Sequence, residues 1–195
     1  MMDFLSNLSN YIDYTILATM ISVIILSFIP KIDLLAENLS KFFMIISVVT
    51  LILMTLIVSY DVIARKLWHG GSIAMQELEW HLFDITFLFS IAYTLARDKH
   101  VRVDIFYDKF SPKVKAVIQI ITIIFFVVPL ATLIVVEAIP FVQMSYEMHE
   151  RSGDPGGLCC RWIIKSTMIW AFIIVLIQSI AELKKAYYKF KYIEE

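Results

Sequence analysis

Glu77, His81 and Asp84 are spaced by four and then three residues, which places them on one face of a predicted helix. Ionisable side chains are costly in lipid and often mark functional positions. Lys165 begins a later hydrophobic run from the same side, and its long side chain can reach deeper. Asp84 or Glu77 can therefore pair with Lys165, either as a brace between helices or as a contact with a partner subunit. We favour such a structural role over a proton or ion path, because a path needs broken helices or polar residues shared by several spans.

Histidine and cysteine chemistry has little support in the sequence. Only His81 lies within a predicted span, whereas a haem held by two histidines needs a ligand on each of two facing helices. Cys159 and Cys160 are adjacent, and neighbouring cysteines form a strained ring. We interpret them as two semi-buried thiols at the membrane interface. We expect no catalytic, substrate-binding or metal-binding residues and no cofactor.

The composition indicates that lipid surrounds this chain. Of its 195 residues, 59% are hydrophobic, whereas soluble domains contain about 45–50% apolar residues. A soluble fold of this length could not bury so much apolar surface. Acidic and basic residues nearly cancel, with a formal net charge of -1, and no basic block follows one helix. Nucleic acid is therefore not an expected partner.

The hydrophobic runs predict an all-α integral membrane protein. Four core transmembrane helices are expected, together with an extra N-terminal hydrophobic helix that is slightly short of the roughly 20 residues needed to span a bilayer. Leu34, Leu35 and Leu39 recur at helical spacing among charged residues, which predicts a short amphipathic helix at the interface. The core runs are 42–64, 77–96, 114–136 and 162–180, the N-terminal run is 14–29, and the amphipathic segment is 31–41.

Three local features refine these helices. Asp61 and Arg65 are four residues apart and can pair at the end of the first core span. Ser111 and Pro112 predict the start of the third core span, since proline is favoured at the first helical position. Pro129 lies within that span and is expected to bend it.

The basic residues predict the orientation in the membrane. The loop 97–115 carries six Lys and Arg residues between two hydrophobic runs. If it faces the cytoplasm, twelve of the seventeen Lys and Arg residues lie on that side and five on the other, in agreement with the positive-inside bias. The C-terminus is then cytoplasmic as well. The N-terminus is periplasmic if 14–29 spans, giving five spans, and there are four if it does not.

Several segments in order resemble the small membrane subunit of tripartite ATP-independent periplasmic (TRAP) transporters, the DctQ family. Residues 92–104 read AYTLARDKHVRVD, which is similar to that family's signature after the second span, and a Ser-Pro helix start follows. The likeness covers roughly 42–185. It also includes Arg65, the turn 77–79, the stretch SGDPGGL at 152–158, Arg161-Trp162 and the stretch 178–182.

The resemblance implies a non-catalytic scaffold subunit. Its expected partners are a large TRAP membrane subunit that houses the substrate and sodium sites and works as an elevator, and a periplasmic binding protein that delivers an organic acid. Membrane phospholipids are a further expected partner, and the bacterial inner membrane is the expected location. The expected divisions are an N-terminal segment 1–41, a four-helix domain 42–185 and a cytoplasmic tail 186–195.

Two groups of candidate site residues follow from these arguments. The first would form contacts between helices or subunits: Glu77, His81, Asp84, Arg161 and Lys165. The second would form the cytoplasmic signature loop and contact lipid headgroups: Arg97, His100, Arg102, Asp104 and Lys109. The alternative function is a membrane anchor of a redox enzyme, which a haem absorption band would distinguish from a transporter subunit.

Overall fold

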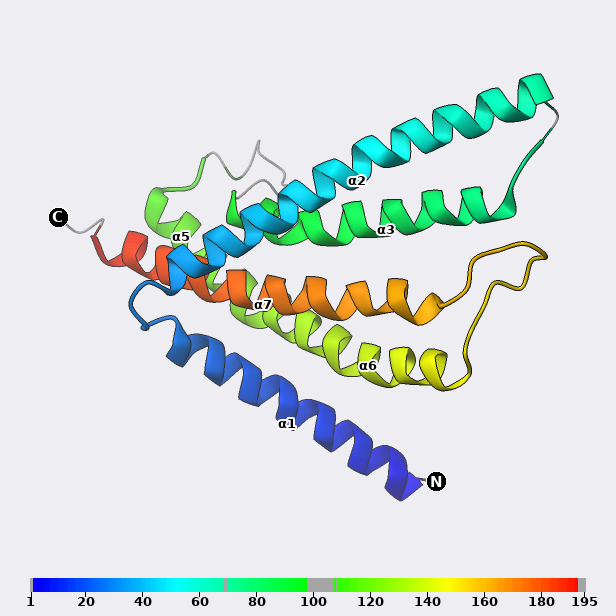
Figure 1. The fold of residues 1–195 in the computed structure, drawn as a ribbon. Helices are drawn as coiled ribbons and strands as arrows, with labels where there is room; N and C mark the ends of the chain where they lie inside the picture. Colours follow the sequence, from blue (N-terminus) through cyan, green and yellow to red (C-terminus); the bar gives the residue numbers. More distant parts are fainter. Residues whose placement is uncertain (1, 69, 98–106, 108, 193–195) are drawn as a thin grey trace.

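The computed structural model describes residues 2–68, 70–97, 107 and 109–192, and the elements of these residues are helical (Figure 1). One of them, η1, is a π-helical turn that joins α5 to α6 without a break, so that α5, η1 and α6 form one long rod. The elements are α1 (Met2–Leu26), α2 (Ile32–Trp68), α3 (Ile73–Ala96), α5 (Pro112–Thr122), η1 (Ile123–Val127), α6 (Val128–Glu147) and α7 (Arg161–Tyr192).

Length and hydropathy make this fold an all-α integral membrane protein. Within the described residues, three helical segments are long and apolar enough to cross a membrane by themselves: Ile32–Leu67, Pro112–Glu147 and Arg161–Tyr192. The helix α3 is more polar because Glu77, Glu79 and Asp84 lie on it. It runs back alongside α2 (Figure 1), so it occupies the same layer. The apolar part of α1, Tyr11–Leu26, is shorter.

The amphipathic segment 31–41 is not a separate surface helix. It forms the first turns of α2, which continues without a break to Trp68 over 37 residues. The change of direction falls earlier, at Lys31, whose backbone has a φ of 66°. Asp33 lies in the first turn of α2 and Arg65 and Lys66 in its last turn, which suits the helix dipole at each end.

The third core span is longer than predicted, and it accommodates Pro129 through a π-helical turn that precedes this residue. Ser111 caps α5, its side chain accepting a hydrogen bond from Val114 N at 3.4 Å, and Pro112 begins the helix as predicted. The wide π turn η1 ends two residues before Pro129, whose ring would crowd the preceding turn of a regular α-helix. The helix then passes through Pro140 to Glu147, further than the expected end at residue 136.

The helices turn back at two opposite ends of the molecule (Figure 1). We call one the loop end: it contains the N-terminus, the α2–α3 connection and the α6–α7 loop. We call the other the tail end: it contains the α1–α2 turn, the start of α5 and the last turns of α7. The helix α7 is central, since it contacts α1, α2, α3, α5 and α6.

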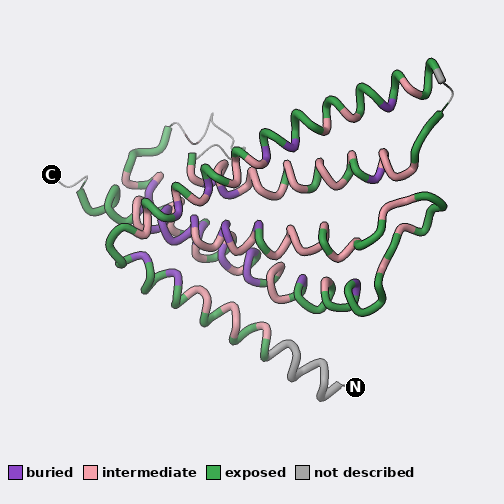
Figure 2. Tube along the Cα trace, viewed as in Figure 1, coloured by how far each residue is buried: buried purple, intermediate pink, exposed green. Residues whose placement is uncertain are grey.

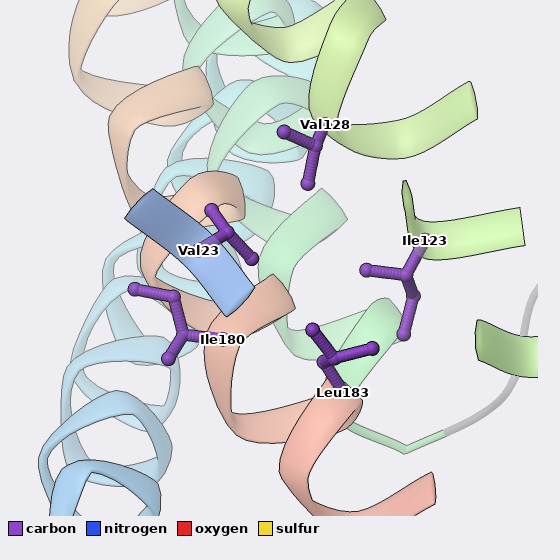
Figure 3. Packing of buried hydrophobic residues seen from close by; sticks show 5 residues of the cluster. All are labelled: Val23, Ile123, Val128, Ile180 and Leu183. Carbon is purple, nitrogen blue, oxygen red and sulfur yellow. The ribbon is translucent and has the colours of Figure 1, made fainter. Parts of the chain in front are cut away.

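Most of the buried side chains lie toward the tail end (Figure 2). One cluster joins α1, η1, α6 and α7 through Val23, Ile123, Val128, Ile180 and Leu183 (Figure 3). The N-terminal helix is therefore packed into the bundle through Val23. A second cluster joins α3, α6 and α7 and is built from Ala92, Leu95, Ala131, Ile174 and Val175.

Candidate functional site

The main polar site lies at the loop end, where the Glu77 carboxylate holds the α6–α7 loop against α3. Its Oε1 accepts hydrogen bonds from Arg161 Nη2 at 3.0 Å and from the hydroxyl of Ser152. Its Oε2 accepts one from the backbone N–H of Leu158 at 2.6 Å. Glu77 itself is buried, with 6% of its surface exposed. We call these four residues the Glu77 clamp.

The loop sequence explains how Glu77 reaches backbone and side-chain donors together. Gly156 adopts a φ of +85°, which a residue with a side chain rarely adopts. A Cβ on Gly157 would collide with Ser152 and would lie 2.8 Å from Glu77 Oε2, so only glycine fits there. Ser152 N donates to Leu158 O at 3.0 Å and closes the loop on itself. The loop is therefore shaped to present its donors to one carboxylate.

The structure gives Lys165 a different partner from the two that we considered. Its Nζ donates to Glu150 in the loop, not to Asp84 or Glu77, and lies 4.0 Å from the centre of the Phe141 ring. The hydrogen bond from the Lys165 ammonium lowers the pKa of the Glu150 carboxyl below its ordinary value. Lys165 thus braces the loop to α7, while Arg161 reaches across to α3.

Asp84 and His81 do not join the clamp. Asp84 is exposed on α3, and within the described part of the chain no hydrogen bond or ion pair holds it. His81 lies beside it, one turn nearer the loop end, and is half-buried. The face shared by Glu77, His81 and Asp84 in the sequence therefore splits into a buried end and an exposed end.

The signature loop is only partly within the described residues. His100, Arg102 and Asp104 lie outside them. Arg97 ends α3, where its guanidinium lies 5.2 Å from the centre of the Tyr93 ring. Lys109 is exposed just before α5.

The tail end contains a second set of polar contacts that the sequence argument did not assign. Lys184 Nζ donates to Asp33 Oδ1 at 2.9 Å and to Ile29 O at 3.3 Å, which ties α7 to the α1–α2 turn. Glu182 is buried, with 3% of its surface exposed, and accepts from Gln178 at 3.0 Å and Lys185 at 2.7 Å. The stretch 178–182 entered the sequence analysis only as part of the family resemblance. Its three polar side chains, Gln178, Ser179 and Glu182, all of them buried, were the signal within an otherwise apolar span.

Two smaller expectations can be compared with the structure. The predicted Asp61–Arg65 pair is confirmed. Cys159 and Cys160 are exposed rather than semi-buried, with their sulfur atoms 2.9 Å apart. Ser152, Leu158 and Glu150 were missed as partners of the charged residues. The two consecutive glycines of the loop, which allow a close backbone approach, were the signal for them.

The polar contacts among the described residues join helices and loops to one another. Glu77 joins α3 to the α6–α7 loop, and Lys184 joins α7 to the α1–α2 turn. A second tie joins α2 and α3 directly: Ser47 Oγ donates to Thr86 O at 2.6 Å, and the hydroxyls of Thr50 and Thr86 lie 2.8 Å apart. Such contacts between helices add stability where lipid provides no hydrophobic drive for association.

The fold and these polar contacts between helices place the protein in the class of polytopic helical membrane proteins. Polar contacts join its helices at both ends of the bundle. The family model for the DctQ component of tripartite ATP-independent periplasmic transporters matches residues 54–187, more than half of the chain. The chain belongs to this family of transporter components. No curated protein matches the sequence.

Proposed function

We propose that this chain is the scaffold subunit of a TRAP transporter, and that it binds and steadies a large membrane subunit without carrying substrate itself. The family match carries the proposal. The Glu77 clamp supports it, because a carboxylate committed to three donors fixes the α2–α3 hairpin against the α6–α7 hairpin. A fixed bundle suits a stationary support for a moving partner.

The transport cycle belongs, in this proposal, to the other components. The large subunit moves an organic acid by an elevator motion driven by sodium, and a periplasmic binding protein delivers the acid. The α1 helix extends the support, because Val23 packs it against η1, α6 and α7. We propose that residues 1–41 form this extension, that 42–185 form the family domain, and that the tail lies in the cytoplasm.

We infer that the tail end faces the cytoplasm of a bacterium and that the chain resides in the inner membrane. The basic residues support this orientation: Lys31 lies in the α1–α2 turn, Lys109 directly precedes α5, and Lys189 and Lys191 lie in the last turn of α7, and these segments form the tail end (Figure 1). These cations are suited to the anionic headgroups of the inner leaflet.

Reconstitution tests the proposed function directly. The chain, the large subunit of its transporter and the binding protein are purified and combined in proteoliposomes, and uptake of labelled organic acids is followed with and without a sodium gradient. We expect uptake only when both membrane subunits are present. Uptake by this chain alone, or a haem absorption band in the purified chain, would contradict the proposal.

A further inference from the structure

The helix α3 exposes a stripe that combines three aromatic rings with one carboxylate. Trp80, Phe83, Asp84 and Phe87 follow the spacing of one helix face. The aromatic side chains are 69%, 55% and 58% exposed, and Asp84 is exposed among them. The rings of Phe83 and Phe87 are stacked, with centroids 6.3 Å apart and an interplanar angle of 9°. We call these four residues the α3 stripe.

The depth of Asp84 makes lipid an unsuitable neighbour for the α3 stripe. The helix has 24 residues, so it is about 36 Å long and barely exceeds the hydrocarbon core. Asp84 lies about 10 Å from Glu77 and about 20 Å from Arg97 along the axis. Its short side chain cannot extend to the headgroups as a lysine can. A carboxylate at this depth requires a polar partner.

Glu137 of α6 is an exposed acidic residue at a similar depth and serves as a comparison for Asp84. It lies about 15 Å from the loop-end terminus of α6, and Asp84 lies about 16 Å from the loop-end terminus of α3. The two residues differ in the cations near them: Phe141, one turn from Glu137 on α6, lies beneath the Lys165 ammonium, whereas the helix α3 contains no Lys or Arg. A cation of this chain therefore lies close to Glu137, while α3 offers none to Asp84.

Three cations on the helices that pack against α3 are already engaged, among them Arg65 of α2, which pairs with Asp61. Arg161 donates to Glu77, and Lys165 donates to Glu150 and lies over the Phe141 ring. Recruiting either to Asp84 would break a contact that holds the α6–α7 loop. Among the described residues no Lys or Arg pairs with Asp84, and His81 is its titratable neighbour on α3. A cation from another chain can therefore complete the pair.

We propose that the α3 stripe is the docking face for one transmembrane helix of the large subunit, and that this helix places a Lys or Arg side chain against Asp84. This inference rests on the proposed function and specifies its contact. The aromatic rings supply a broad surface for van der Waals packing, which drives helix association in lipid, and the ion pair fixes the register. The residues facing the rings on the partner helix are apolar.

Substitution of Asp84 in the complex tests the docking face, with Glu137 as the matched control. We expect Asp84→Leu to weaken binding of the co-expressed large subunit about tenfold in a pull-down titration, and Glu137→Leu to leave it unchanged. The isolated Asp84→Leu chain should be no less heat-stable than the wild type, because the substitution removes an unpaired carboxylate from an apolar environment. Equal binding by both variants would overturn the inference.

Photocrosslinking provides a second test that does not depend on the folding of Asp84→Leu. Benzoylphenylalanine replaces Phe87 in one variant and Phe126, an exposed ring of η1, in the other. We expect a crosslink to the large subunit from position 87 alone. A crosslink from 126 and none from 87 would place the partner elsewhere and overturn the inference. Failure of the wild-type chain to bind the large subunit at all would overturn the proposed function together with it.

Discussion

The two ends of the helix bundle are held together by different means. Toward the tail end, α7 buries ten of the sixteen side chains from Ala171 to Ala186, and four of these are Ala or Ser. At the loop end, its first ten residues include no buried side chain, and Glu77 is the only buried residue in the first half of α3. Figure 2 shows the same contrast along the bundle.

The difference shows that close packing and polar ties can replace each other along one membrane bundle. Small residues such as Ala92, Ala131 and Ala181 let the helices approach closely, and dispersion contacts then hold them. Where the hairpins are less closely packed, a folded loop and one carboxylate bridge them. The tail end should therefore govern global stability, and the loop end should govern local opening.

The largest effect is expected from overpacking the tail end. Ala181 has 0% of its surface exposed, so Ala181→Leu must push α7 away from its neighbours. We expect a loss of about 1–3 kcal/mol in the free energy of unfolding, seen as a lower thermal midpoint in detergent micelles. Ala18→Leu on the exposed side of α1 is the control and should change little. Equal midpoints for the two variants would show that the tail end is not the stability core.

A smaller and more local effect is expected from removing the clamp. Glu77→Ala leaves the Leu158 N–H, the Ser152 hydroxyl and the Arg161 guanidinium without their shared acceptor. We expect faster proteolysis of the 148–160 loop, with a thermal midpoint that falls less than in Ala181→Leu. Glu147→Ala, which removes an exposed contact with Gln143 within α6, is the matched control and should leave the loop protected. Unchanged loop cleavage in Glu77→Ala would contradict the clamp.

The smallest effect is expected from acid. The hydrogen bond from Lys165 lowers the folded-state pKa of Glu150 below its value in the unfolded chain. The stabilising contribution is therefore complete above the unfolded pKa of about 4.5 and is lost as pH falls through the lower folded pKa. Loop protection against an acid-active protease should decline over this range, and Glu150→Gln should reduce that dependence. A Glu150→Gln variant with the full wild-type pH dependence would assign the effect to another carboxyl group.

The sequence predicted those features that depend on short-range patterns. Hydrophobic runs located the core spans, and Ser111-Pro112 located the start of α5, because capping chemistry is local. The Asp61–Arg65 pair was equally readable, since helical spacing alone brings the two side chains together. The predicted helix boundaries were less accurate. The helix α2 begins at Ile32 instead of residue 42, and α6 ends at Glu147 instead of residue 136. Polar residues can extend a helix beyond its hydrophobic run when their side chains find polar partners or solvent.

Partner choice was the part that spacing could not decide. The sequence identified Glu77, Arg161 and Lys165 as residues that form polar contacts. It did not identify their partners Glu150, Ser152 and Leu158, because these lie in a loop about 75 to 80 residues away from Glu77 in sequence, and the path of that loop is not a local property. The shape of that loop is set by Gly156 and Gly157 together with its attachment to α6 and α7.

The sequence by itself determined that this chain is a helical membrane protein with a basic connecting loop, because hydropathy and charge are summed along the chain and need no fold. Only the tertiary structure decided that Glu77 is buried and bonded while Asp84, seven residues later, is exposed and unpaired within the described part of the chain. The physical reason is that α3 meets the α6–α7 loop at its first turns, and whether a side chain faces that contact is a property of the assembled bundle.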